Sequence, residues 1–158
     1  MSPQPGAGQL TGSAVSSVLE AMQAALAAEH AVIFGYAVAG AHLAGADLTA
    51  AREADAAHRD RRDALATAIR GRGADPVAAE PAYRLPFPVT GRLQSSRLAA
   101  TLEEGTAAAW RYLVAAADTA DLRGTAVAAL TDAAVQATRW RRRYDPVHAA
   151  VPFPGQPA

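Results

Sequence analysis

Residues 71–94 read GRGADPVAAEPAYRLPFPVTGRLQ, and this stretch restricts how the rest of the chain can fold. Its four prolines, at positions 76, 81, 86 and 88, exclude a continuous helix and an inner strand. An extended proline-rich chain covers about 3.1 Å per residue, so ten of these residues span about 30 Å, the length of a 20-residue helix. The stretch can therefore run from one end of a helical bundle to the other.

Helical sequence lies on both sides of this stretch. Ala, the best helix former, is the commonest residue, and Gly and Pro divide the remainder into four segments. We predict helices over about 13–44, 49–70, 95–118 and 122–144. The short links within each pair predict two antiparallel hairpins. Joined by a crossover over about 71–94, they predict an all-α, ferritin-like four-helix bundle.

The 158 residues suffice for one domain. We place that domain at 13–145, after a disordered N-terminal segment (1–12) and before a proline-rich C-terminal tail (146–158). The first twelve residues lack the pattern of a signal peptide, and acidic or His residues interrupt the longest apolar runs. We therefore expect a cytoplasmic protein with no membrane span.

Composition argues against several other classes of function. Without Cys the chain cannot use thiolate catalysis or thiolate-held metals. The basic residues are all Arg, and they balance the acidic residues to a net charge of zero, so we expect no nucleic-acid partner. One Arg run could suggest DNA binding, but we interpret it as a solvated helix end: Arg139, Arg141, Arg142 and Arg143.

Helical periodicity predicts which polar residues face the core. Glu29 falls within the apolar stripe of the first helix, and Glu103 lies on the side of Trp110 in the third, although Glu104 would face inward if that helix started one residue late. Leu65 and Ile69 set the inner face of the second helix, which then also carries three polar residues: Asp55, His58 and Arg62. In the fourth helix, Val127 and Leu130 predict an inner face with Thr131 and Thr138 but no acid or His.

Buried charges need partners, and two arrangements could supply them. In the first, the Asp55-x-x-His58 spacing lets one helical turn offer two ligands to a metal ion, and Glu29 and Glu103 complete an iron or manganese site. In the second, Arg62 bridges the carboxylates and no cofactor is needed. Tyr36 lies close enough along the stripe to hydrogen-bond an acid.

Four motifs together resemble a bacterial ferritin-like domain family of unassigned function. They are Ala27-Ala28-Glu29-His30 through Tyr36, Asp55-x-x-His58-Arg59-x-Arg61-Arg62, Glu80-Pro81-Ala82-Tyr83-x-Leu85-Pro86-Phe87-Pro88-Val89 and Leu102-Glu103-Glu104-Gly105. The resemblance covers roughly residues 13–145 and implies the ferritin-like fold.

The resemblance also implies a ligand pattern. Glu29 and Glu103 match the single acids of di-iron relatives, and Asp55 with His58 matches one paired motif, with Asp for Glu. The fourth helix offers only Gln136-x-x-Arg139, on its polar side. We therefore expect a degenerate di-iron site in a non-catalytic binding or structural module without a cofactor. The alternative is an iron- or manganese-dependent oxidoreductase with ligands Glu29, Asp55, His58 and Glu103, and with Tyr36 beside them.

One apolar feature lies outside the core stripe. Phe34 and Val38 form a shoulder on the first helix, which a crossover residue such as Phe87 or a second copy of the helix must cover. This predicts a homodimer.

Overall fold

The computed structural model describes residues 7–156, with side chains from residue 17 onward. Over these residues the chain forms four helices and no strands, which confirms the predicted all-α four-helix class: α1 (Ala7–Gly40), α2 (Gly45–Gly71), α3 (Arg92–Ala116) and α4 (Ala120–Arg141). The predicted disordered segment is only partly described, because residues 1–6 lie outside the description. Residues 7–12 belong to α1, since the chain has no proline between Pro5 and Pro76 to interrupt it.

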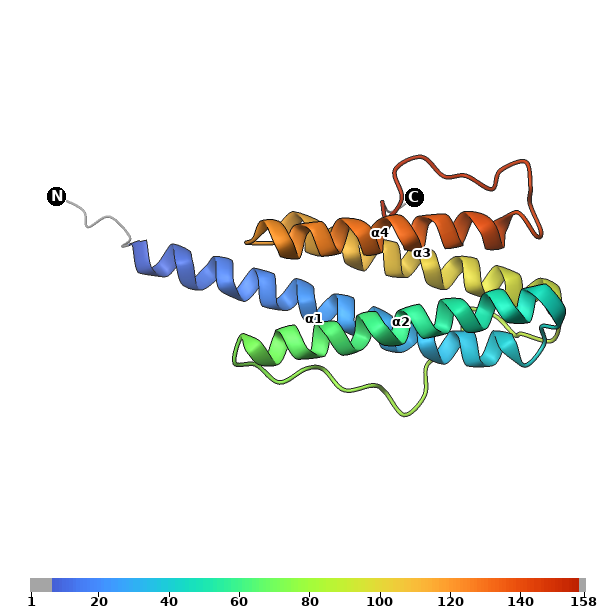
Figure 1. The fold of residues 1–158 in the computed structure, drawn as a ribbon, viewed down its shortest axis with the longest axis horizontal. Helices are drawn as coiled ribbons and strands as arrows, with labels where there is room; N and C mark the ends of the chain where they lie inside the picture. The colour runs from blue at the N-terminus through green and yellow to red at the C-terminus, as the bar shows by residue number, and fades with distance from the viewer. Residues whose placement is uncertain (1–6, 157–158) are drawn as a thin grey trace.

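The helices pack side by side, with α1 and α4 running one way and α2 and α3 the other (Figure 1). Residues 72–91 form only turns and irregular chain, and Figure 1 shows them leaving α2 and running along the outside of the bundle. Gln23 of α1 holds this link: its Nε2 donates to the Asp75 carbonyl at 2.7 Å, and its Oε1 accepts from the Val77 amide at 2.8 Å.

The link also covers part of the apolar shoulder on α1. The rings of Phe34 and Tyr83 lie 5.4 Å apart, and Val38, Leu85 and Phe87 pack against one of the core clusters. Tyr83, four positions before the expected Phe87, is thus the residue whose ring meets Phe34.

Two apolar clusters fill the core. Leu26 belongs to the first and Val32 to the second, so the bundle has a polar layer between them at the level of Glu29. The largest members of the first cluster are Met22, Leu26, Leu65, Ile69, Trp110 and Leu113; those of the second are Val32, Tyr36, Leu43, Leu98 and Trp140.

The predicted inner face of α4 is only partly right: Leu130 packs against the first core cluster, but other residues predicted to face inward do not. Val127 is 45% exposed and Thr131 is also exposed, and small residues face the core in their place: Ala126, Ala129, Ala133 and Ala137, followed by Trp140. Alanines at this spacing let α4 approach α3 closely, whereas the valines lie on the outer side. Thr119 caps the helix by accepting from the Leu122 amide at 3.2 Å.

The Arg run is not the uniform solvated face that we expected. Arg141 is buried and pairs with Glu104, and the Arg143 Nε donates to Asp47 at 2.8 Å. The expectation was wrong for these two because the start of α2 and the chain after α4 fold against them. Two members of the run stay exposed as expected: Arg139 and Arg142.

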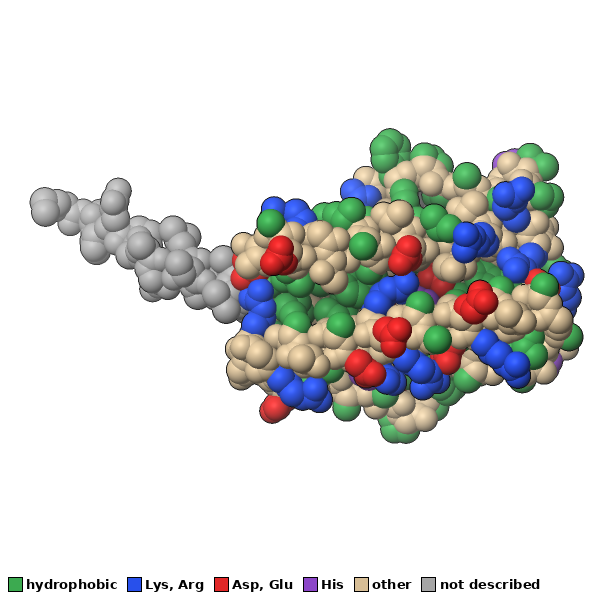
Figure 2. Space-filling model, in the orientation of Figure 1, with side chains coloured by type: hydrophobic (Ala, Val, Ile, Leu, Met, Phe, Trp, Pro, Cys, Tyr) green, Lys and Arg blue, Asp and Glu red, His purple; other side chains and the backbone are tan. Residues whose placement is uncertain are grey.

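Charge and hydropathy on the remaining surface are mixed. Figure 2 shows acidic and basic side chains interspersed along α2, and several basic side chains gathered toward the C-terminal end of α4. By length and hydropathy alone, Ser17–Gly40 of α1 could cross a membrane. In the bundle, the apolar residues of this segment supply core contacts and its inner face carries Glu29, as in a core helix of a folded domain. The expected absence of a membrane span stays a prediction.

Candidate functional site

Three helices bring one ionisable residue each to the centre of the bundle. Glu29 of α1, His58 of α2 and Glu103 of α3 have exposed fractions of 0%, 1% and 0%. Each is held by an amphipathic helix whose neighbouring inner residues are apolar, so the polar groups meet one another and not water. The structure thus brings together three of the five residues predicted to form the buried cluster.

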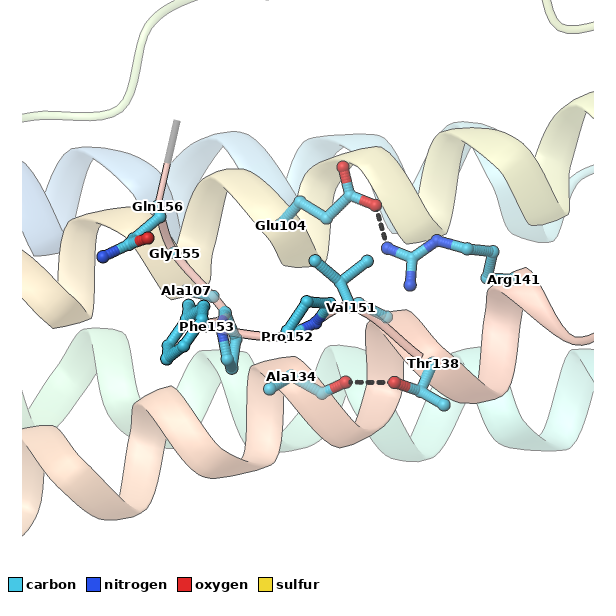
Figure 3. A pocket seen from close by; sticks show the side chains of 12 residues that line it. Glu104, Ala107, Ala134, Thr138, Arg141, Val151, Pro152, Phe153, Gly155 and Gln156 are labelled. Atoms are coloured by element: carbon cyan, nitrogen blue, oxygen red, sulfur yellow. Dashed lines mark hydrogen bonds and ion pairs between the residues drawn. The ribbon is translucent and has the colours of Figure 1, made fainter. Parts of the chain in front are cut away.

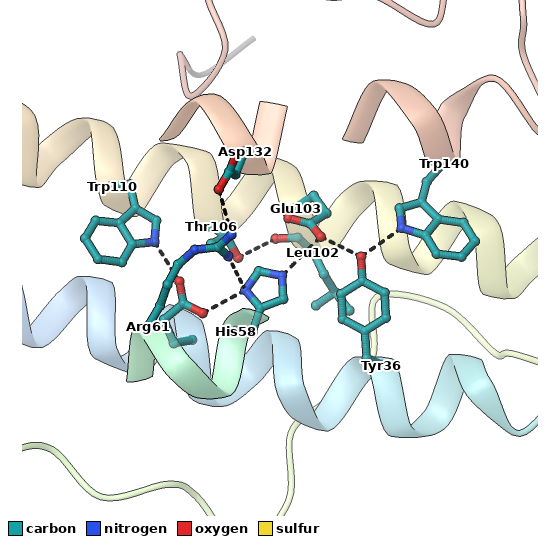
Figure 4. A network of polar contacts seen from close by, with 10 residues as sticks. Tyr36, His58, Arg61, Leu102, Glu103, Thr106, Trp110, Asp132 and Trp140 are labelled. Carbon is teal, nitrogen blue, oxygen red and sulfur yellow. Dashed lines mark hydrogen bonds and ion pairs between the residues drawn. The ribbon is translucent and has the colours of Figure 1, made fainter. Parts of the chain in front are cut away.

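The His58 ring lies between the two carboxylates. Its Nδ1 is 2.7 Å from Oε2 of Glu29, and its Nε2 is 3.1 Å from Oε1 of Glu103. Both contacts lie within hydrogen-bonding distance, and each joins a histidine nitrogen to an acid on a different helix (Figure 4).

Aromatic side chains extend this arrangement in both directions. The indole Nε1 of Trp110 donates to Oε1 of Glu29 at 2.6 Å, and the Tyr36 hydroxyl donates to Oε1 of Glu103 at 2.5 Å. Trp140 of α4 in turn donates to the Tyr36 oxygen at 2.8 Å. We call the resulting chain of hydrogen bonds the core network. It joins all four helices, and its members, in order, are Trp110, Glu29, His58, Glu103, Tyr36 and Trp140.

The carboxylates control the charge of His58. Burial alone lowers the pKa of a histidine, but hydrogen bonds to Glu103 and Glu29 outweigh it and raise the pKa of His58 to about 9. The raised pKa favours the imidazolium form of His58 at neutral pH, in which each ring nitrogen donates to a carboxylate. Burial, and next the charge of Glu103, raise the pKa of Tyr36 well above its usual value, so Tyr36 remains a donor.

Arg61, and not the predicted Arg62, joins the centre. Nη1 of Arg61 lies 3.1 Å from Nδ1 of His58, to which it can donate only when that nitrogen is unprotonated, and its Nη2 donates to Asp132 of α4 at 3.3 Å. Arg62 points outward and pairs with Asp63. Adjacent residues of a helix point about 100° apart, so a prediction that is off by one position selects Arg62 in place of Arg61. With Arg61 and His58 positive, the charges of Glu29 and Glu103 are balanced.

Asp55 is also outside the cluster. It is partly exposed on α2, and its Oδ2 accepts from Nε of Arg59 at 2.8 Å. The predicted Asp55-x-x-His58 pair does not meet in a hydrogen-bonded cluster, because the Arg one turn further along the helix holds one carboxylate oxygen of Asp55. The other oxygen, Oδ1, is buried and has no hydrogen-bond partner among the described residues.

In this arrangement the side chains pair with one another. A histidine ligand must present a free, unprotonated nitrogen, and each ring nitrogen of His58 already lies within hydrogen-bonding distance of a carboxylate. Across the part of the chain that the structure describes, no three His, Cys, Asp or Glu side chains are grouped so as to hold a metal ion. As it stands, the arrangement can cross-link helices and hold protons.

Sequence reasoning missed two members of the centre. Trp140 follows the alanine stripe of α4 at helical spacing, and that stripe was the signal that would have set the phase of this helix. Arg61 gave no separate signal, because it is one of two adjacent arginines with equal chemistry.

The fold and the site together define an all-α four-helix protein whose polar layer is a buried acid–histidine–acid network. The chain belongs to a family described as a domain of unknown function, DUF4439, whose model matches residues 21–158. The matched region includes the whole core network and the chain that follows α4.

A solved structure shows a similar fold. The chain is similar to a conserved hypothetical protein from Mycobacterium tuberculosis, with 39% sequence identity and a TM-score of 0.78, over 84% of this chain and 98% of the other. The comparison with curated proteins gives no match.

Proposed function

We propose that this protein is a ferritin-like structural or binding module, non-catalytic and without a cofactor, in which the core network occupies the place of a degenerate di-iron site. The observation that carries the proposal is the pairing of both His58 nitrogens with buried carboxylates. A network that is already balanced in charge joins the four helices without an added ion.

The direction of the helices supports the ferritin-like part of the proposal. The parallel course of α2 and α3 requires a connection as long as the bundle, and residues 72–91 are the segment between them. Two hairpins with one such connection characterise ferritin-like bundles, whereas simple up-and-down bundles have short loops throughout.

Metal analysis tests the proposal. In protein purified without chelators, we expect iron and manganese far below one ion per chain by plasma mass spectrometry. Added Fe²⁺ or Mn²⁺ should also leave the melting temperature unchanged, because no vacant ligand set binds the ion. Near-stoichiometric iron or manganese that is lost in His58→Ala would overturn the proposal.

A second candidate is the iron- or manganese-dependent oxidoreductase, and one observation favours it. Oε2 of Glu103 is buried and has no hydrogen-bond partner among the described side chains, which is the state expected of a carboxylate that awaits a ligand. This candidate requires His58 to lose a proton and Asp55 to leave Arg59, so that both can join Glu29 and Glu103. Glu103→Gln separates the two: it should abolish metal retention only if this second candidate is right.

The homodimer stays a prediction as well. Phe34 and Val38 remain partly exposed beneath the link, which leaves apolar surface that a second copy could cover. A sedimentation experiment that shows a monomer at micromolar concentration would contradict it. We likewise retain a cytoplasmic location and the absence of a nucleic-acid partner as proposals.

A further inference from the structure

A cavity lies between the outer sides of α3 and α4 and the C-terminal tail (residues 149–156). Its volume is about 390 Å³, within the range of small-molecule sites. Figure 3 shows small side chains such as Ala107 and Ala134 along the two helices, and the tail crossing over them. The floor is therefore apolar and shallow, and the tail forms the roof.

The tail is held at both ends of this cavity. Near its start, the buried Arg141 donates to the Ala149 carbonyl and pairs with Glu104. Near its end, Gly155 has a φ of 79°, and a Cβ there would lie 2.7 Å from the Ala107 carbonyl oxygen. Only glycine allows the backbone to touch α3 in this way.

Between these two anchors the tail leaves apolar side chains incompletely covered. Val151 and Phe153 line the cavity, yet they are 51% and 71% exposed. An apolar molecule in the cavity would remove both side chains from water, which favours binding.

A second cleft adjoins the cavity and supplies charge. It has a volume of about 480 Å³ on the outer face of α4 and shares Ala134, Thr138 and Pro154 with the first. Arg139 and Arg142 line it, no acid does, and neither guanidinium has an ion-pair partner among residues 17–156. The two clefts together thus present a mainly apolar chamber, with the Glu104–Arg141 ion pair on one wall, next to two unpaired guanidinium groups.

We propose that the joined clefts bind a single-chain aliphatic carboxylate. The hydrocarbon chain lies under the tail between α3 and α4, and the carboxylate binds Arg139 and Arg142, whose planar donors suit it. Arg141 keeps its own partner, Glu104, and takes no part in binding. This site is on the outer side of α3 and α4, so it does not depend on the role of the core network.

Calorimetric titration of the full chain with dodecanoate, below its micelle concentration, tests the proposal. We expect one molecule bound per chain, and binding at least about tenfold weaker for dodecanol, which lacks the charge. Arg139→Gln with Arg142→Gln should also weaken dodecanoate about tenfold and reduce its salt dependence. Arg84→Gln, at an exposed arginine of the link, is the matched control and should change neither.

Blocking the chamber gives an independent test. Ala134→Leu fills the space shared by the two clefts and should abolish binding, whereas Ala128→Leu, at an exposed alanine of the same helix, should not. If Ala134→Leu does not fold, Phe153→Asp changes an exposed side chain and places a carboxylate at the chamber, with the same expected loss.

Several results would overturn the proposal. They are the absence of saturable dodecanoate binding, equal affinity for dodecanol, and unchanged binding in both Ala134→Leu and Phe153→Asp. Binding to anionic phosphatidylglycerol vesicles without binding to free dodecanoate would also overturn it, and would identify the surface as a membrane contact.

Discussion

A buried histidine between two carboxylates links protonation to folding. In the unfolded chain His58 has an ordinary pKa near 6.5, and in the folded chain the pKa is about 9. Because the folded pKa is the higher one, the stabilisation is complete below about pH 6.5 and is lost as the pH rises through about 9.

The free energy of unfolding should therefore fall between about pH 6.5 and pH 9, by roughly 3 kcal/mol. Urea denaturation at a series of pH values measures this directly. His42, an exposed histidine at the end of α1, offers the control: His42→Gln should keep the pH dependence and His58→Gln should lose it. A wild-type protein of constant stability over this range would contradict the charge assigned to His58.

The two tryptophans of the core network make different hydrogen bonds. Trp110 donates to a carboxylate, and Trp140 donates to the hydroxyl oxygen of Tyr36. We expect Trp110→Phe to destabilise the protein by about 1 kcal/mol more than Trp140→Phe, because loss of a donor to a buried charge costs more. Both substitutions remove the same atoms, so thermal and urea denaturation of the two variants can be compared directly. Equal losses would show that Glu29 does not depend on Trp110.

At the scale of single residues, the sequence indicated three of the side chains that meet at the centre of the bundle. Glu29 and Glu103 are polar members of otherwise apolar stripes, so periodicity alone indicated their direction. Leu65 and Ile69 indicated the direction of His58, but the same phase also selected two residues that lie outside the cluster, Asp55 and Arg62. The choice between Arg61 and Arg62 lies below the resolution of a helical wheel, since either long side chain can reach the core depending on the local tilt of α2.

At the scale of the helices, Gly35 allows α1 to lie close to Leu102 of α3. A Cβ at Gly35 would lie 2.0 Å from Cδ1 of Leu102 and 3.2 Å from its Cγ. Gly35→Ala must therefore displace Leu102, and we expect it to destabilise the protein by about 1–2 kcal/mol, despite the better helix propensity of alanine.

Gly105 and Gly124 provide the matched comparison. Both lie within helices, and an added Cβ meets nothing within 4 Å at either position. Gly105→Ala and Gly124→Ala should each stabilise the protein by about 0.5–1 kcal/mol in urea denaturation. A stabilising Gly35→Ala would contradict the close approach of α1 and α3.

The elements themselves were largely predictable, and α4 shows where prediction fails. Glycine and proline mark the ends of the helices because they act on the backbone locally, so the four segments followed from the sequence. The inner face of α4 depends on which partner approaches it, and a helix with both valines and alanines offers two apolar faces. The larger valines led us to predict that their side of α4 faces the core. In the structure the alanine side faces the core, because it packs closely against α3.

For the whole molecule, the core network explains why a polar layer can divide the core. The acids, His58 and Arg61 balance in charge, and hydrogen bonds from Trp110, Tyr36 and His58 together satisfy three of the four carboxylate oxygens of Glu29 and Glu103. The charge balance depends on residues of α1, α2 and α3, and Trp140 of α4 completes the hydrogen-bond network. Sequence patterns could indicate the inward acids but not the geometry by which they are neutralised.

The most direct test of this balance is the nitrogen-15 NMR spectrum of the His58 ring at about pH 7.5, before and after excess Mn²⁺ is added. We predict that both ring nitrogens show the shifts of protonated imidazolium, and that Mn²⁺ leaves their signals sharp. An unprotonated nitrogen, with signals that broaden and disappear at one Mn²⁺ per chain, would contradict the account.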